Sequence, residues 1–321
     1  MPSIRFVECS EPGFSRRRQG KTWRYFYPDG RAVKSSTTIA RLNAIALPPA
    51  YTDAWYSIDP KGHILATGID DRGRKQYRYH PHYREAQEDE KYRQTQAFGA
   101  ALPCIRVAVE RDLLRRDLSL DRVVAAVVRL LDLGSVRIGN RQYAEANRSF
   151  GATTFRNKHA AVRGQKVHLE FIGKSGKQQR LSIEDKRLAR VVRQCLETPG
   201  QLLFQYRDST GSLAPVTSGD VNDYLRRHGG DFTAKSFRTW AGSCIAFTSW
   251  VSAGGQVTIK GVMEDVAQRL GNTPAIARKS YVHPAIVQAI SDKVAPPKKL
   301  PRATRHMSRE ERGMLMFLQA T

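Results

Sequence analysis

The sequence predicts an α+β protein: a small N-terminal β-sheet domain followed by a larger, mainly α-helical domain. Strand-like alternation and turn residues fill residues 1–84. From about Tyr83 onward, amphipathic helical periodicity takes over. Residues 293–321 are basic and contain several prolines. We therefore expect three parts: a β-rich domain at 1–84, a helical domain at 85–292, and a C-terminal extension at 293–321 with a short helix.

The N-terminal domain carries several hairpin patterns. Residues Trp23–Val33, "WRYFYPDGRAV", alternate and turn at Asp29-Gly30. Two more short strands flank Pro60-Lys61-Gly62, and Gly73–His80, "GRKQYRYH", has the pattern of a further strand. Helical patterns are weak in this part, so we predict a sheet.

The larger domain is predicted to be helical with one hairpin, Lys166–Ile183, that interrupts the helices. Ser308 and Glu311 form a capping box for a terminal helix, Arg309–Gln319. A short helix should also follow Thr273, because Pro274 suits its first turn. The other predicted helices are Glu85–Ala101, Ile105–Arg116, Leu120–Leu133, Ile183–Glu197, Gly219–Arg227, Lys235–Val251 and Ile259–Leu270.

The charge of the chain predicts a polyanionic partner. Its 321 residues include 53 Lys and Arg against 30 Asp and Glu, a net charge of +23 spread over the whole length. Nucleic acid is the simplest partner for such a folded, basic chain. The four cysteines stand singly, without zinc spacing, and no apolar run approaches a membrane span. We expect a soluble intracellular protein in a reducing compartment.

The hairpin contains Gly173-Lys174-Ser175, the closing residues of a nucleotide-binding P-loop. The first P-loop glycine would stand five residues earlier, where this chain has His168. The flanking alternation also predicts two strands rather than a strand and a helix. Lys174 is therefore a turn lysine, and its role depends on the rest of the chain.

Three further segments hold candidate residues that are ordinary when taken singly. Arg137 in "SVRIGN" is typical of a cation near a helix end, and Lys235 and Arg238 are typical of a solvated basic turn. In "RLGNTPAIARKSYVHP", Asn272 stands nine residues before Tyr281. Alone, Tyr281 is more typical of a partly buried core tyrosine than of a nucleophile.

Taken together, the order and spacing of these segments resemble type IB DNA topoisomerases, and within them the compact poxvirus-like branch found in many bacteria. The resemblance covers roughly residues 3–290. It includes "GRKQYRYH", which is similar to a DNA-contacting strand of that family, and Thr153–His159, "TTFRNKH". The helical domain would then have the catalytic fold shared by these topoisomerases and tyrosine recombinases.

The resemblance implies a role for each candidate. Tyr281 would attack a DNA phosphodiester, while Arg137 and Arg238 hold its nonbridging oxygens and Lys174 protonates the leaving 5′ oxygen. Asn272 stands where many members carry histidine, so it could donate a hydrogen bond but carry no charge. The implied DNA contacts are Arg74, Lys75, Gln76, Tyr77, Tyr79, Asn140, Gln142, Tyr143, Lys158 and Lys235.

The residue types suit this chemistry. A tyrosine hydroxyl has an ordinary pKa near 10, and neighbouring guanidiniums favour its phenolate and neutralise the phosphorane-like transition state. Arginine pairs bidentately with phosphate oxygens. Cleavage and resealing exchange one phosphodiester for another, so we expect no ATP, no metal and no other cofactor.

We expect a monomer that clamps double-stranded DNA in the bacterial cytoplasm, at the nucleoid. Two alternatives remain open. A tyrosine recombinase usually has His-x-x-Arg where this chain has Lys235-Ser-Phe-Arg238, and usually begins with a helical domain. A non-catalytic basic DNA-binding protein would explain the charge but leave the ordered Arg/Lys/Arg/Asn/Tyr set unexplained.

Overall fold

The computed structural model describes residues 4–321, apart from the side chains of Asp89, Lys91 and Tyr143. The chain divides into two compact units, Met1–Lys91 (unit 1) and Tyr92–Thr321 (unit 2). Helix α2 (Pro81–Asp112) contains the boundary between them. The predicted α+β architecture is confirmed, with an antiparallel sheet first and helices after it.

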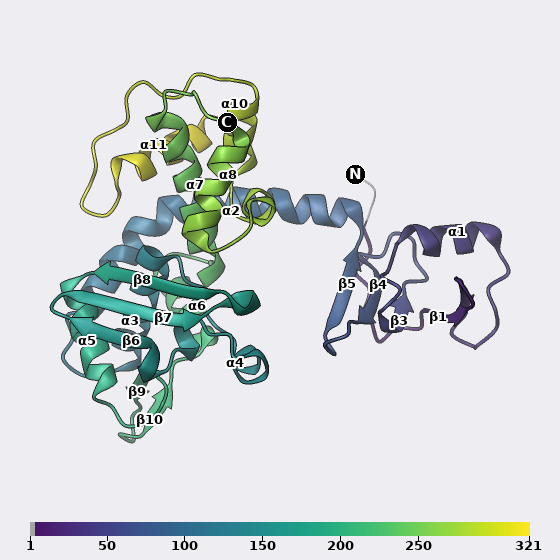
Figure 1. Ribbon diagram of the computed structural model, residues 1–321, viewed down its shortest axis with the longest axis horizontal. Coiled ribbons are helices and arrows are strands. Elements are labelled where there is room, and N and C mark those ends of the chain that lie inside the picture. The colour runs from purple at the N-terminus through teal and green to yellow at the C-terminus, as the bar shows by residue number, and fades with distance from the viewer. Residues whose placement is uncertain (1–3) are drawn as a thin grey trace. The chain divides into compact units, whose positions relative to one another are not determined.

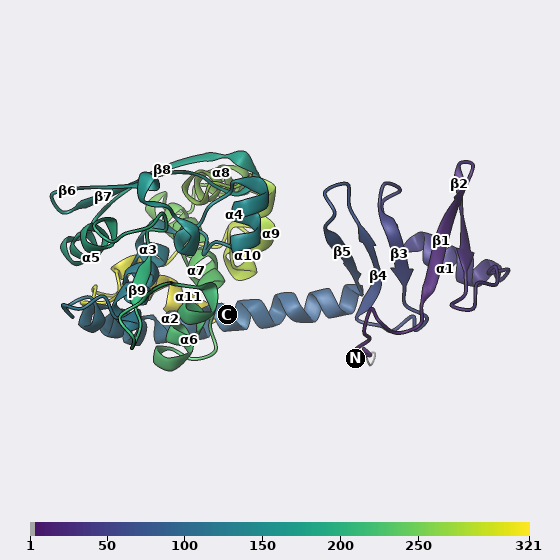
Figure 2. The ribbon, with the colours of Figure 1, turned by 90° about the horizontal axis from the view of Figure 1, so that it is seen from below.

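Unit 1 is a five-stranded antiparallel sheet in the order β2-β1-β3-β4-β5 (Figure 2). Its core joins buried side chains of the strands, such as Phe14, Tyr25 and Tyr56, to Leu42 of helix α1. The elements are β1 (Phe14–Gln19), β2 (Thr22–Phe26), α1 (Ser36–Ala44), β3 (Thr52–Tyr56), β4 (Ile64–Ile69) and β5 (Lys75–Tyr79).

Two features of unit 1 differ from the prediction. Strand β2 pairs along its length with β1 through a tight turn at Gly20, whose φ of 61° favours glycine. The predicted turn at Asp29-Gly30 forms, but it closes only one bridge, Phe26–Ala32. Helix α1 was not predicted, because only Leu42 of its nine residues is buried and its apolar periodicity is therefore short.

Unit 2 contains a helical core and a three-stranded sheet, β6-β7-β8, with a separate pair β9-β10 (Figure 1). The strands are β6 (Ala160–Arg163), β7 (Lys166–Ile172), β8 (Gln178–Glu184), β9 (Gln205–Arg207) and β10 (Leu213–Pro215). The helices after α2 are α3 (Leu120–Gly134), α4 (Arg141–Asn147), α5 (Lys186–Leu196), α6 (Ser218–His228), α7 (Ala234–Ser252), α8 (Ile259–Leu270), α9 (Pro274–Ser280), α10 (Pro284–Ser291) and α11 (Arg309–Gln319).

The predicted hairpin is confirmed as β7 and β8, which pair from Lys166–Glu184 to Ile172–Gln178. One face of the sheet packs against α3 and α5 through Val167, Leu169 and Phe171, whereas the other face is open to solvent. Strand β8 continues to Glu184, so the predicted helix at 183–197 begins only at Lys186. There the Asp185 carboxylate accepts hydrogen bonds from two backbone N–H groups.

The predicted break between the helices 85–101 and 105–116 is wrong, because α2 runs through Pro103. Proline in a helix interior costs about 3 kcal/mol or more. Against this stands the packing of Phe98, Leu102, Ile105 and Val109, all buried in the core of unit 2. Tertiary packing therefore outweighs the local preference to end the helix.

The C-terminal segment is packed against unit 2, and Met314 and Leu318 of α11 are buried in its core. The Arg106 guanidinium donates to the carboxylates of Asp132 and Glu311, each at 2.8 Å. Glu311 also accepts from the indole N–H of Trp240 on α7, at 3.1 Å. Whether the predicted boundaries at 84 and 292 delimit functional domains stays a prediction.

Candidate active site

Arg238 lies in the first turns of α7, with its side chain directed into the core of unit 2. The residue is 4% exposed. Its guanidinium donates hydrogen bonds to the backbone carbonyls of Ser135, which follows α3, and of Leu270, which ends α8. Its Nε is buried and has no partner within the described residues. The arginine thus connects α7 to the ends of α3 and α8, and its Nε–H is a donor available to a ligand.

Arg137 and Asn272 meet beside it. The Arg137 guanidinium donates to Asn272 Oδ1 at 2.7 Å. Asn272 follows Gly271, whose φ of 64° ends α8 in the left-handed region. Because Oδ1 is occupied by Arg137, Asn272 Nδ2 is left as a buried donor with no partner in the described part of the chain. Buried donors without a partner are rare and indicate a ligand or functional site.

Tyr281 stands at the C-terminal end of α9 and is fixed to α7 through its backbone. The Ser243 hydroxyl donates to the Tyr281 carbonyl at 3.2 Å and accepts from the His283 N–H at 2.9 Å. A Cβ on Gly242 would lie 2.8 Å from the same carbonyl, so only glycine allows this approach. The Arg238 Cζ lies 4.9 Å from the centre of the Tyr281 ring.

The pKa of Tyr281 lies below its ordinary value. Burial alone would raise the pKa, but the charges of Arg238, Arg137 and Lys174, together with hydrogen bonding to Arg238, outweigh that effect. Burial and the like charge of Arg137 in turn lower the pKa of Arg238, which still stays protonated at physiological pH. The tyrosine is therefore held in a field that favours its phenolate.

Lys174 reaches this group from the tip of the β7–β8 hairpin. Ser175 and Gly176 turn the chain with φ of 64° and 73°. The hairpin is held to the α8–α9 loop, where Lys177 Nζ lies 3.5 Å from the Asn272 carbonyl. A cleft of about 120 Å³ is lined by Lys174, Arg137 and Arg238 together.

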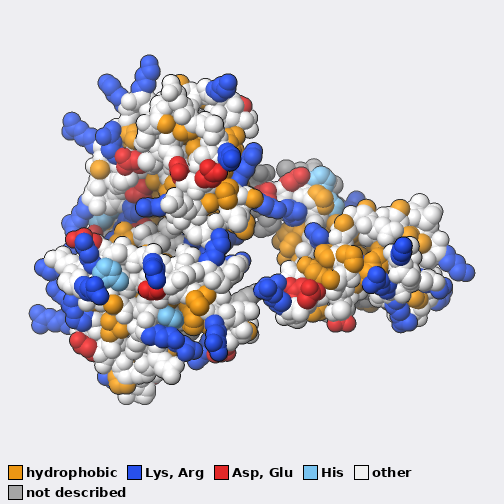
Figure 3. Space-filling view, in the orientation of Figure 1, with side chains coloured by type: hydrophobic (Ala, Val, Ile, Leu, Met, Phe, Trp, Pro, Cys, Tyr) orange, Lys and Arg blue, Asp and Glu red, His pale blue; other side chains and the backbone are white. Residues whose placement is uncertain are grey.

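The lining of this cleft is strongly cationic. Its described residues include no Asp or Glu, whereas the basic ones are Arg137, Lys174, Arg180, Arg238 and Arg269. The face of unit 2 in Figure 3 likewise shows more Lys and Arg than Asp and Glu. Within residues 4–321, no group of three or more His, Cys, Asp or Glu side chains has the arrangement of a metal site. The cleft suits a phosphate anion.

Comparison with known proteins decides the family. The sequence model described as "Eukaryotic DNA topoisomerase I, catalytic core" matches residues 80–307, and "Bacterial DNA topoisomerase IB, N-terminal domain" matches residues 22–70. The chain belongs to the type IB DNA topoisomerase family. It is accordingly an isomerase that relaxes supercoiled DNA, and DNA is its partner.

Curated relatives place this type IB topoisomerase near viral members. It is 29% identical to DNA topoisomerase 1B of Acanthamoeba polyphaga mimivirus over 285 residues, 84% of this chain and 85% of the relative. It is 19% identical to DNA topoisomerase 1B of Vaccinia virus (strain Copenhagen), over 72% of this chain and 73% of that one. The resemblance to the poxvirus-like and bacterial branch is thereby confirmed.

The DNA contacts predicted for the N-terminal domain of this topoisomerase lie on or beside β5. Tyr77 and Tyr79 stack with ring centres 5.9 Å apart and are 43% and 40% exposed. Lys75 lies over the Tyr77 ring. Arg74 and Gln76 donate to the Asp70 carboxylate, which fixes them beside the strand. That the exposed Tyr77 and Tyr79 rings contact DNA stays a prediction.

The DNA contacts predicted in unit 2 of the topoisomerase are dispersed and do not line the cleft. Asn140 and Gln142 are exposed at the start of α4, and the side chain of Tyr143 lies outside the described part of the structure. Lys235 is exposed on the first turn of α7, and Lys158 lines a second hollow on the sheet. Sequence reasoning missed Ser243, because a serine within an apolar helix carries no pattern of its own.

Among the described residues, no helix combines the length and the apolar character that a membrane span requires.

Proposed function

We propose that the chain relaxes supercoiled DNA by cutting one strand through Tyr281. The tyrosine oxygen attacks the phosphorus, forms a 3′-phosphotyrosyl bond and releases a strand with a 5′-hydroxyl. The observation that carries this proposal is the contact of the half-buried Tyr281 ring with Arg238, whose Cζ lies 4.9 Å from the ring centre. The charges of Arg238, Arg137 and Lys174 outweigh burial and lower the pKa of Tyr281, which favours the nucleophilic phenolate.

Arg137, Arg238 and Asn272 would hold the nonbridging phosphate oxygens. Arg137 and Arg238 line the cleft, and Asn272 accepts a hydrogen bond from Arg137. The buried Arg238 Nε and Asn272 Nδ2 have no partner in the described residues. Phosphate oxygens would satisfy them. Donors fixed in advance stabilise the charge that develops in the transition state, and one such donor is worth roughly 10²–10³ in rate.

Lys174 would act as the general acid. The bond between phosphorus and the 5′ oxygen breaks as the bond to the Tyr281 oxygen forms, and the Lys174 ammonium gives its proton to the leaving oxygen. The proton lost by the tyrosine passes to water. Resealing reverses these steps, with Lys174 accepting the proton back. Such proton transfer contributes about 10²–10⁴ in rate.

The reaction exchanges one phosphodiester for another of similar energy, so it calls for no ATP, and torsion in the DNA drives strand rotation between the two steps. Because the cationic side chains of Arg137, Lys174 and Arg238 line the cleft where the phosphate would bind, we infer that no metal is needed. We further propose that one chain acts as a monomer that clamps the duplex, and that it works on the bacterial nucleoid in the cytoplasm.

The test is relaxation of supercoiled plasmid in EDTA without ATP, by the native protein and by Tyr281→Phe. The native protein should produce a ladder of topoisomers and, after quenching in detergent, a covalent adduct at the 3′ end of the broken strand. Tyr281→Phe should bind DNA but produce no topoisomer ladder and no covalent adduct. Relaxation by Tyr281→Phe, or a dependence on added metal, would overturn the mechanism. Recombination between paired sites would instead favour the recombinase alternative.

A further inference from the structure

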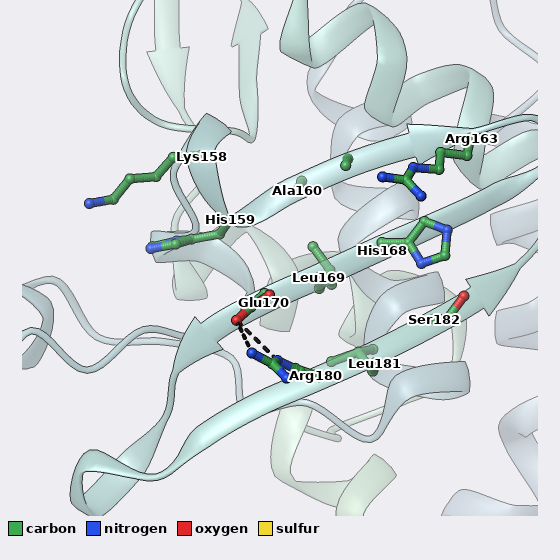
Figure 4. A pocket seen from close by; sticks show the side chains of 11 residues that line it. Lys158, His159, Ala160, Arg163, His168, Leu169, Glu170, Arg180, Leu181 and Ser182 are labelled. Atoms are coloured by element: carbon green, nitrogen blue, oxygen red, sulfur yellow. Dashed lines mark hydrogen bonds and ion pairs between the residues drawn. The ribbon is translucent and has the colours of Figure 1, made fainter.

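The hairpin of β7 and β8 continues past the Glu170–Arg180 ion pair to its tip (Figure 4), and the tip carries Lys174. The Lys174 side chain is exposed and has no hydrogen bond or salt bridge within the described residues. The turn around it is closed by a backbone hydrogen bond from the Gly173 N–H to the Lys177 carbonyl, at 2.8 Å. The place of the Lys174 ammonium therefore depends on how the whole tip is held.

The strand register directs Gln179 toward the interior of unit 2. Gln179 is paired with Phe171 across the hairpin, and Phe171 is buried in the core. Paired residues share a face of the sheet, so the Gln179 side chain lies on the inner face, where it is half-buried. Its neighbours Gln178 and Arg180 lie on the solvent-facing side and donate to Glu170. Of the two adjacent glutamines, only Gln179 is thus placed to contact the active site.

The Gln179 side chain lines the cleft and lies between two glycines that precede active-site residues. A Cβ on Gly173, the residue before Lys174, would lie 3.1 Å from Gln179 Cγ. A Cβ on Gly271, the residue before Asn272, would lie only 2.7 Å from Gln179 Oε1. The φ of 64° at Gly271 also favours glycine. The side chain of one residue therefore packs against the backbone on both sides, next to the lysine and next to the asparagine.

We propose that Gln179 is a positioning residue for the general acid. Its side chain packs the hairpin tip against the α8–α9 loop and so fixes Lys174 relative to Asn272. Lys177 adds to this contact, since its Nζ lies 3.5 Å from the Asn272 carbonyl. Proton transfer requires the two groups at hydrogen-bond distance, and a displacement of about 1 Å can cost about 10²-fold in rate. The Gln179 amide has no proton to give at neutral pH, so it acts through the lysine.

This inference rests on the proposed function, and its test changes the leaving atom. One duplex carries a site that the native protein cuts, and a second has sulfur in place of the 5′ bridging oxygen at that site. When its phosphorus–sulfur bond breaks, a thiolate leaves without needing a proton, because thiols have a pKa of only about 8.5. Single-turnover cleavage of both duplexes is measured at saturating protein for the native chain, Gln179→Ala and Lys174→Ala. Gln178→Ala, which shortens the glutamine on the other face, is the matched control.

On the oxygen duplex, we expect Gln179→Ala to cleave about 10- to 10²-fold more slowly than the native protein, with native DNA affinity. On the sulfur duplex, the two should cleave at the same rate. Lys174→Ala should show the same pattern with a larger loss, and Gln178→Ala should match the native protein on both duplexes. Lys174→Ala/Gln179→Ala should be no slower than Lys174→Ala alone, because effects that pass through one group are not additive.

Native cleavage of the oxygen duplex by Gln179→Ala would overturn the proposal. Equal slowing of this variant on both duplexes would also overturn it, since damage to the fold or to phosphate binding does not depend on the leaving atom. Failure of the proposed function is a different result, because Lys174→Ala would then stay slow on the sulfur duplex. In that case the roles given to both residues would be wrong.

Discussion

Two arginines of unit 2, the half-buried Arg106 and the buried Arg238, have opposite surroundings. Arg106 lies between the carboxylates of Asp132 and Glu311, and these outweigh the effect of burial, so its pKa is raised. Arg238 donates to backbone carbonyls and, in the described residues, to no carboxylate, so burial and then the like charge of Arg137 lower its pKa. The first charge is neutralised within the protein. The second has no carboxylate partner in the described residues and could pair with an anion, which supports the proposal that the cleft is the functional region.

The largest expected effect on stability comes from breaking the neutralised network. Glu311→Ala removes one of the two carboxylates that bind Arg106 and leaves Asp132 as its partner. It should lower the free energy of unfolding by about 1.5–3 kcal/mol, the range for a hydrogen bond to a charged group. Burial opposes ionisation of Glu311, but Arg106 keeps its pKa below the ordinary value. This contribution is therefore present above the ordinary pKa of the carboxyl and is lost as pH falls through the lowered one.

Urea unfolding of the native protein, Glu311→Ala and Glu310→Ala provides the measurement. Glu310 is a neighbour on the same helix with only a 3.9 Å contact to Arg309, so its loss should cost under about 0.5 kcal/mol. Equal effects of the two substitutions would show that the Arg106 network does not stabilise unit 2.

Arg238→Ala should act on the reaction. We expect single-turnover cleavage of a duplex to slow by about 10²–10³, because a preorganised donor to the phosphate is lost. Arg226→Ala, which removes an arginine from an exposed pair with Asp223, is the matched control and should cleave at the native rate. Native cleavage by Arg238→Ala would place the reacting phosphate elsewhere.

Ser243→Ala tests how the nucleophile is positioned. The substitution removes the hydroxyl that joins the Tyr281 carbonyl to the His283 N–H, and so frees the segment that carries the tyrosine. We expect cleavage to slow roughly tenfold, equivalent to about 1.4 kcal/mol in activation free energy, with native DNA affinity. Ser249→Ala on the same helix is the control. A loss of affinity with native cleavage of bound DNA would contradict the positioning role.

The smallest predicted effect is a displacement of the pH profile. A protonated tyrosine is a poor nucleophile, so single-turnover cleavage should rise with pH and level off below the ordinary tyrosine pKa of about 10. Arg137→Ala removes one of the charges that lower the Tyr281 pKa, so its profile should move to higher pH. An identical midpoint in the native protein and the variant would show that the charge of Arg137 does not lower the pKa of Tyr281.

Much of the fold could be predicted from the sequence, and the missing part has a physical cause. Local patterns located α8 and α11 to the residue and the β7–β8 hairpin to within one residue, since periodicity and capping are short-range. Helix α2 runs through Pro103 because of long-range packing, which no window of sequence contains. Likewise the order and spacing of several motifs pointed to Arg137 and Tyr281 together. The Ser243 bridge and the Arg106 network join residues distant in the chain and have no such motif.

The position of helix α11 at the end of the chain bears on the order in which unit 2 is synthesised and folded. It is translated after Tyr281, yet its Glu311 completes the network that reaches Trp240 on α7, the helix that carries Arg238. A nascent chain that has just received Tyr281 therefore still lacks part of the core against which the Arg238 helix packs. We therefore expect a chain that ends before α11 to hold Arg238 less firmly than the whole chain does.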